Sequence, residues 1–158
     1  MERPGTPAAI TSPPRTATRK SREPAPRNQR RWIRAELILD HGWPASDVGF
    51  EQGEFDAVAY DAHGRIGLTM EARARTTGPD SLDKLVRAWM RFGADPAADL
   101  NNNAGRKWRE LTKLCLDGPV AVWLVADGAR WTLTARNGDA GPVLVPGGSP
   151  DRATHTDQ

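Results

Sequence analysis

The feature that most constrains the fold of this chain is an uninterrupted apolar run, Val-Ala-Val-Trp-Leu-Val-Ala, at residues 120–126. The run begins after a Gly-Pro pair and ends at an Asp-Gly pair, and both pairs are typical of turns. A short, valine-rich apolar run between turn signals predicts a strand that is buried on both faces of a sheet. Seven residues are too few to cross a bilayer, which takes about 20 residues in a helix, so we do not expect an integral membrane protein.

Two segments upstream predict a β-hairpin, because apolar and polar residues alternate in each. Residues 54–60 place Phe55 on one face of a strand and Asp56 on the other, and residues 66–73 place Glu71 and Arg73 together on one face. The intervening Asp-Ala-His-Gly is typical of a tight turn. We therefore expect Asp56 and Glu71 to lie on neighbouring strands.

Helical spacing and capping signals predict three helices around these strands. Asp80 or Ser81 can cap the second helix, and the third begins at a run of three asparagines. The predicted helices cover residues 32–41, 82–92 and 102–116, and two further strands cover residues 46–51 and 131–135. This order predicts an α/β domain with a mixed sheet.

The ends of the chain differ from this core in composition and charge. Residues 1–31 carry eight basic and two acidic side chains, whereas the rest of the chain carries 14 basic and 18 acidic ones, so the net charge of +2 hides a basic arm. Six prolines and few large aliphatic residues predict that residues 1–30 are disordered. We expect the folded domain over residues 31–136. Residues 137–158, rich in glycine and proline, are expected to form a flexible tail in which residues 143–145 can add a short edge strand.

Two interpretations of the basic arm stay open: attraction to nucleic-acid phosphates, or a solubilising leader from a start codon placed too far upstream. The first thirty residues lack the apolar segment of a secretory signal. A single cysteine, Cys115, excludes an internal disulfide and a cysteine-rich zinc site. These features predict a cytoplasmic protein.

The predicted hairpin brings together the residues best suited to catalysis. Asp56 and Glu71 are carboxylates on adjacent strands, and Arg73 adds a cation beside Glu71. Mg²⁺ and Mn²⁺ prefer hard oxygen ligands, and one or two carboxylates suffice where a substrate phosphate completes the coordination shell. The residues therefore predict a site with Mg²⁺ or Mn²⁺ as cofactor, where the metal would activate water against a phosphodiester.

This pattern resembles the PD-(D/E)-X-K nuclease superfamily, which has the restriction-endonuclease-like fold. Phe55-Asp56 stands where that family has Pro-Asp, and Glu71-Ala72-Arg73 stands where it has Glu-X-Lys. The resemblance covers about residues 32–126 and implies an αβββα(α)β core with a mixed sheet. It implies further that Asp56 and Glu71 bind the metal, together with the carbonyl of Ala72.

Two other positions follow from this resemblance. Several family members use a Glu on the first helix, which implies a supporting catalytic role for Glu36. At Arg73 the chain departs from the family lysine. Lysine can lose its proton and activate water, whereas arginine stays protonated and can only hold a phosphate or stabilise charge. Lys84, on the following helix, could supply an amine from a different backbone position.

Residues 32–51 and 106–109 also resemble uncharacterised small actinobacterial and phage-associated proteins, which implies no activity.

Basic side chains outside the hairpin predict contacts with DNA. Arg106-Lys107-Trp108-Arg109 combines cations with an aromatic ring, although helical spacing favours a place in the core for Trp108. Arg87 and Arg91 could face a phosphate or a solvated helix surface. The predicted nucleic-acid contacts are Arg75, Lys84, Arg106, Lys107 and Arg109.

The combined pattern predicts a nuclease-like domain that engages DNA and hydrolyses it, as an endonuclease or an exonuclease, with Mg²⁺ or Mn²⁺. One alternative is a catalytically inactive module of the same fold that binds DNA or protein, and Arg73 favours it. Another is an unrelated small α/β protein in which Asp56, Glu71 and Arg73 form an ion pair on a solvated sheet face, worth about 0.2–1 kcal/mol. The chain contains neither a Walker loop nor a dinucleotide-binding glycine motif, which argues against nucleotide hydrolysis and redox chemistry.

Overall fold

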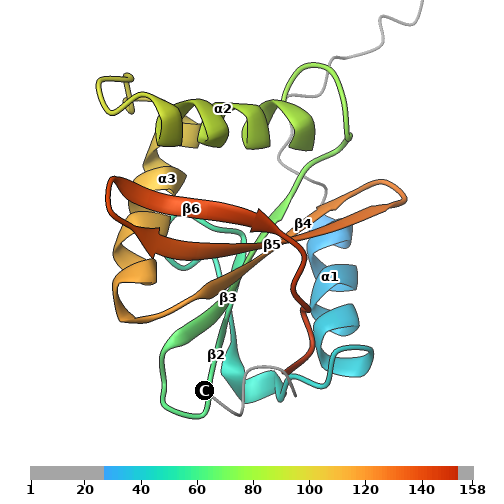
Figure 1. Cartoon of the computed structure of the whole chain (residues 1–158). Coiled ribbons are helices and arrows are strands. Elements are labelled where there is room, and N and C mark those ends of the chain that lie inside the picture. The colour runs from blue at the N-terminus through green and yellow to red at the C-terminus, as the bar shows by residue number, and fades with distance from the viewer. Residues whose placement is uncertain (1–26, 153–158) are drawn as a thin grey trace, which may run out of the picture.

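A computed structural model describes residues 27–152, in which three helices surround one six-stranded mixed sheet (Figure 1). The helices are α1 (Arg27–Leu39), α2 (Leu82–Ala94) and α3 (Asn103–Leu114). The strands are β1 (Val48–Phe50), β2 (Ala57–Tyr60), β3 (Ile66–Ala72), β4 (Val120–Ala126), β5 (Ala129–Gly138) and β6 (Gly141–Pro146). Short 3-10 helices, Ala45–Asp47 and Cys115–Asp117, precede β1 and follow α3.

The strands follow one another across the sheet in chain order, β1 to β6. All neighbours are antiparallel except β3 and β4, which are parallel. A parallel connection must cross over the sheet, and α2 and α3 form this crossover between β3 and β4. The predicted α/β class with a mixed sheet is confirmed. No helix within residues 27–152 has both the length and the apolar character that a membrane span requires.

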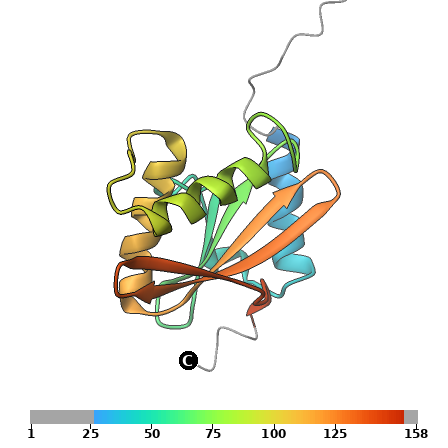
Figure 2. The same ribbon diagram turned by 45° about the horizontal axis from the view of Figure 1, so that its top comes forward.

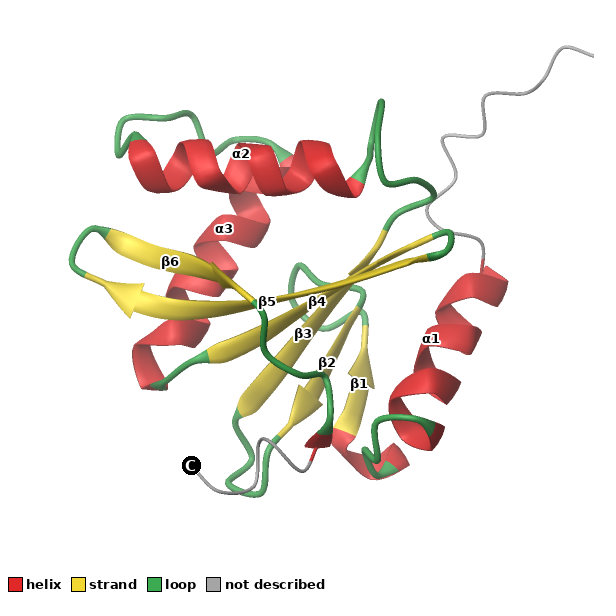
Figure 3. Ribbon diagram, turned by 45° about the vertical axis from the view of Figure 1, so that its right-hand side comes forward, coloured by secondary structure: helices red, strands yellow, loops and turns green. Residues whose placement is uncertain are grey.

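Helices cover the two faces of the sheet (Figure 3). On one face, Ile33 and Leu37 of α1 pack with Met70 and Trp123. On the other face, α2 lies across the strands with α3 beside it (Figure 2), and the two helices bury Trp89, Leu111, Val122 and Leu124. Every residue of β4 is buried, as its apolar run predicts. Trp108 and Cys115 are buried as well, as helical spacing predicts.

Side-chain caps fix where the two crossover helices begin. The hydroxyl of Ser81 accepts a hydrogen bond from the backbone N–H of Lys84 at 3.2 Å, and the side chain of Asn102 accepts one from Gly105 at 2.7 Å. Asp80, just before the first cap, has a positive φ of 52°, a conformation that aspartate adopts more readily than most residues. The two helices begin within one residue of their predicted starts.

The hairpin departs from its prediction at the start of its first strand. Because β2 begins at Ala57, the strict alternation expected over residues 54–60 does not extend to Phe55. Phe55 packs against Trp89 on the α2–α3 side, with ring centroids 6.4 Å apart, whereas Ala57 and Ala59 face α1. Phe55 thus lies on the face opposite to the one predicted.

Both predicted ends of the domain need correction. Helix α1 begins at Arg27, inside the predicted arm, while residues 1–26 lie outside the described part of the chain. Within the predicted flexible tail, β5 continues to Gly138, and β6, which contains the edge strand expected at residues 143–145, pairs with it. Leu144 of β6 packs against the core, and this burial stabilises the added strand.

Beyond β6 the chain returns to the end of α1. The indole Nε1 of Trp43 donates to the carbonyl of Pro150 at 2.6 Å, and the backbone N–H of Arg152 donates to the carbonyl of His41 at 2.9 Å. His41 Nδ1 lies 2.7 Å from a carboxylate oxygen of Asp151. These contacts anchor residues 150–152 on the turn that follows α1.

Candidate functional site

Backbone pairing places Asp56 beside the end of β3. Ala57 pairs with Met70, and the N–H of Asp56 donates to the carbonyl of Met70 at 3.1 Å. The Asp56 side chain then reaches across, and its Oδ2 accepts a hydrogen bond from the N–H of Ala72 at 2.9 Å. The carboxylate is thereby held next to Glu71, as the hairpin predicts.

Glu71 is a buried carboxylate at the carboxyl end of a parallel strand. Its exposed fraction is 1%, so the alternative of an ion pair on a solvated sheet face does not hold. Burial raises the pKa of the Glu71 carboxyl above its usual value, and the negative charge of Asp56 raises it further, while Lys107 and Arg73 act in the opposite direction. In open α/β sheets, ligands bind beyond the carboxyl ends of the strands, which is where Glu71 lies.

Two cations contact the Glu71 carboxylate. Arg73 Nη2 lies 3.0 Å from Oε1, and Lys107 Nζ lies 2.9 Å from Oε2. The contact to Oε2 is an ion pair, and no other group among the described residues donates a hydrogen bond to Oε2. This buried oxygen therefore keeps capacity for a further ligand.

Lys107 is the main correction to the predicted site. It is predicted to face DNA from the surface of α3, but its exposed fraction is only 5%. Its Nζ also donates to the carbonyl of Glu54 and lies 5.3 Å from the centre of the Phe55 ring. The sequence carries a signal of this burial, because Lys107 precedes buried Leu111 by four residues and so shares its helix face.

Glu36 does not join this site. It lies on α1, which covers the opposite face of the sheet, and its carboxylate forms hydrogen bonds of 3.0–3.2 Å with Arg130. His41 lies 3.9 Å from the same carboxylate. The sheet separates Glu36 from Glu71, so the supporting role implied by the resemblance is wrong for this residue.

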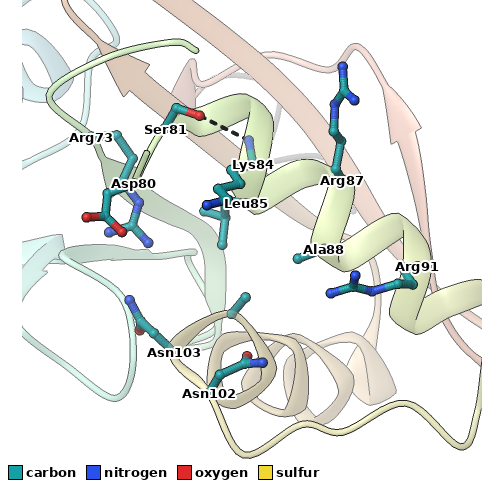
Figure 4. A pocket seen from close by; sticks show the side chains of 11 residues that line it. Arg73, Asp80, Ser81, Lys84, Leu85, Arg87, Ala88, Arg91, Asn102 and Asn103 are labelled. Atoms are coloured by element: carbon teal, nitrogen blue, oxygen red, sulfur yellow. Dashed lines mark hydrogen bonds between the residues drawn. The ribbon is translucent and has the colours of Figure 1, made fainter. Parts of the chain in front are cut away.

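Arg73 connects Glu71 to a cleft of about 570 Å³ between α2 and the start of α3 (Figure 4). Lys84 lines this cleft from α2 and is exposed, so the amine beside Glu71 comes from Lys107 and not from Lys84. Asn102 and Asn103 line the opposite wall. Asp80 lies close to Arg73 at the end of the cleft nearest β3 (Figure 4).

The other basic residues predicted to contact DNA are exposed but scattered. Arg75 lies in the loop after β3. Arg106 pairs with Glu54 at 3.4 Å, and Arg109 Nη2 donates to the side chain of Asn101 at 3.2 Å. None of these three residues lines the cleft.

The residues present fit a hard divalent cation held with few protein ligands. Asp56 and Glu71 supply neighbouring carboxylates, and Oε2 of Glu71 contacts no donor among the described residues other than the Lys107 amine. Within residues 27–152 no group of three or more His, Cys, Asp or Glu side chains is arranged to hold a metal. This donor set suits Mg²⁺ or Mn²⁺, which keep several waters and use substrate phosphate as a ligand, and it does not suit a closed structural zinc site.

Comparisons of the chain with models of known protein families, with curated proteins and with solved structures gave no match.

Proposed function

We propose that this protein hydrolyses phosphodiester bonds in DNA with the help of Mg²⁺ or Mn²⁺ bound by Asp56 and Glu71. The observation that carries the proposal is the buried Glu71 carboxylate, which lies beside Asp56 and beside the amine of Lys107. Such a concentration of ionisable groups is costly to bury, and groups of this kind cluster at active sites.

The arrangement of elements supports the same proposal. Helix α1 is followed by three antiparallel strands, by the crossover helices and by β4 parallel to β3. This order agrees with the one that the resemblance to PD-(D/E)-X-K nucleases implies. Asp56 directly precedes β2, Glu71 and Ala72 end β3, and Arg73 follows the strand directly; these are the positions where that family carries its motif.

Each side chain then has a role that suits its chemistry. Asp56 and Glu71 hold the cation, which when bound would lower the pKa of a water and neutralise charge on the phosphate. Arg73 cannot lose its proton, so it binds a phosphate oxygen through its guanidinium group. Lys107 supplies the amine that the motif lacks at residue 73, and its Nζ can orient a water molecule through a hydrogen bond.

A second candidate function is favoured by one observation. Both oxygens of Glu71 already contact a cation, Arg73 or Lys107, so the carboxylate is neutralised without a metal. A protein in which these ion pairs persist would be a catalytically inactive module that binds DNA.

An assay of supercoiled DNA cleavage by the full chain in Mn²⁺, Mg²⁺ or EDTA distinguishes the metal-dependent hydrolase from the inactive module. Glu71→Gln keeps the shape of the side chain but weakens metal binding, and Lys107→Met keeps its apolar stem but removes the amine. Asp139→Asn, at the exposed β5–β6 turn, is the control for loss of one carboxylate.

We expect cleavage that requires the metal, falls by about 100-fold or more in Glu71→Gln and Lys107→Met, and is unchanged in Asp139→Asn. Circular dichroism of each variant verifies that it is folded. Cleavage that persists in EDTA or in Glu71→Gln contradicts the proposed site. DNA binding without cleavage in either metal favours the inactive module.

A further inference from the structure

The cleft between α2 and α3 has walls of different chemistry. Its cations lie mainly along α2, at positions 84, 87 and 91, which share one helix face. Its floor includes the apolar side chains of Leu85, Ala88 and Ala104. The far wall carries two amides, Asn102 and Asn103, at the start of α3. Asp80 is the one acidic residue among the cleft-lining residues of the described chain.

Two of the cations are free to bind an external anion. Within residues 31–152, neither Lys84 nor Arg91 forms an ion pair with a carboxylate. Figure 4 shows both side chains turned toward the space between the helices. Arg87 points away from this space and pairs with Asp83 at 2.9 Å.

We propose that this cleft binds the sugar–phosphate backbone of one DNA strand, with Lys84 and Arg91 contacting phosphates and Arg73 holding the phosphate nearest Glu71. The proposal deepens the proposed function and rests on it for the choice of DNA. Charge complementarity carries it, because Lys84 and Arg91 line this space without a carboxylate partner among residues 31–152, and a polyanion would neutralise both.

The dimensions favour a chain over a small anion. Lys84 and Arg91 are seven residues apart, which corresponds to about 10 Å along a helix that rises 1.5 Å per residue. A B-form strand carries one phosphate per about 3.4 Å of helix axis, so the row is long enough for Lys84 and Arg91 to contact two different phosphates of one strand. The apolar floor between the two cations suits the sugars that lie between successive phosphates.

Arg73 links this cleft to the proposed catalytic residues. One of its nitrogens contacts Glu71, and the residue also lines the cleft. A strand that follows α2 toward Ser81 therefore reaches Arg73, which contacts the buried carboxylate of Glu71. Lys84 and Arg91 are binding residues in this arrangement and touch none of the groups that would hold the metal.

Fluorescence anisotropy with a labelled oligothymidylate tests the proposal on the full chain. Measurements in EDTA prevent cleavage, so binding is read separately from catalysis. The test variant is Lys84→Ala/Arg91→Ala. The matched control, Lys113→Ala/Arg136→Ala, removes the same charges from exposed positions outside the cleft.

We expect the cleft variant to bind about tenfold more weakly, with the control within about twofold of the wild type. The slope of log K against log salt concentration should fall in magnitude by about 1.4, since each phosphate contact to a single strand contributes about 0.7. Equal weakening in both variants, or none in either, overturns the proposal. Displacement of the DNA by polyglutamate at equal charge overturns it also, in favour of an acidic protein partner.

Hydrogen exchange supplies a second measurement, which binding through residues 1–26 cannot mimic. Addition of the oligothymidylate should protect peptides from α2 and the start of α3, and no protection there contradicts the proposal. The outcomes distinguish this inference from the proposed function. Cleavage that is unaffected in Lys84→Ala/Arg91→Ala overturns the cleft alone, whereas cleft binding without cleavage overturns catalysis alone.

Discussion

At the scale of single residues, Glu71 is the buried ionisable group on which both the stability of the fold and the proposed function depend. Its carboxylate is buried with Asp56 on one side and the cations of Arg73 and Lys107 on the other. Breaking a buried ion pair by removing one partner costs about 3–5 kcal/mol, whereas an apolar replacement of the whole group is often neutral. Stability alone therefore does not account for this group of buried charges.

The raised pKa of Glu71 predicts how stability depends on pH. The folded protein keeps a proton on Glu71 at pH values where the unfolded chain, with a pKa near 4.5, has released it. The folded state thus binds more protons in this window, so the contribution of Glu71 to stability falls as the pH rises from about 4.5 through the folded-state pKa.

Urea denaturation of the wild type and Glu71→Gln between about pH 5 and pH 8 measures this effect. We expect the free energy of unfolding of the wild type, relative to Glu71→Gln, to decrease with rising pH by at most about 1.4 kcal/mol per unit. A relative stability that increases with pH would show that the two cations outweigh burial. Taking the difference between the two free energies of unfolding cancels the contributions of the other titrating groups.

At the scale of elements, α3 is the element that assembles the site. Its first turn is capped by Asn102, it packs Trp108 and Leu111 into the core, and it delivers Lys107 to Glu71. The close approach of its first turn to the preceding loop depends on Gly105, where an added Cβ would overlap the backbone of Leu100. The position of Lys107 therefore depends on a glycine two residues earlier.

Gly105→Ala is expected to destabilise the protein by about 2 kcal/mol or more, because backbone cannot yield as a flexible side chain can. Gly93→Ala, in α2, is the control. A Cβ there would lie 3.6 Å from Trp108, an ordinary contact, so its helix propensity should stabilise the protein by about 0.5–1 kcal/mol. Thermal denaturation of both variants checks this, and equal effects would contradict the close approach.

At the scale of the whole molecule, the C-terminal segment ties the sheet to α1. The chain leaves β6, and its residues 150–152 bind the turn that follows α1, where Trp43 is buried. The indole N–H of Trp43 would lose its hydrogen bond to the Pro150 carbonyl if this segment were absent. A buried donor without a partner costs about 1–3 kcal/mol.

Ending the chain at Gly148 is therefore expected to lower the free energy of unfolding by about 1–3 kcal/mol. Ending it at Arg152 is the reference, since this truncation keeps every described contact of the segment, and we expect the chain that ends at Gly148 to be the less stable of the two. Chemical denaturation of the two truncated chains gives the comparison. Equal stability of both would show that the contacts of Pro150 and Asp151 add nothing.

The candidate site shows which residues a local pattern can place. Asp56, Glu71 and Arg73 lie within 18 residues of one another on a hairpin, so the two-residue period of strands brings them together. Lys107 and Glu36 are placed by the docking of α3 and α1 on opposite faces of the sheet. The pattern of a helix shows which of its faces is apolar, but not which face of a distant sheet that helix will cover.

The sequence by itself determined the buried strand at residues 120–126, the caps of α2 and α3, the core position of Trp108 and the α/β class, because each depends on periodicity and short-range hydrogen bonds. Only the tertiary structure decided that Lys107 contacts Glu71, that Glu36 lies across the sheet, and that residues 150–152 return to α1. These contacts join residues 36, 94 and 107 positions apart. They form because whole elements gain more by burying their apolar faces than any single pair of residues can specify.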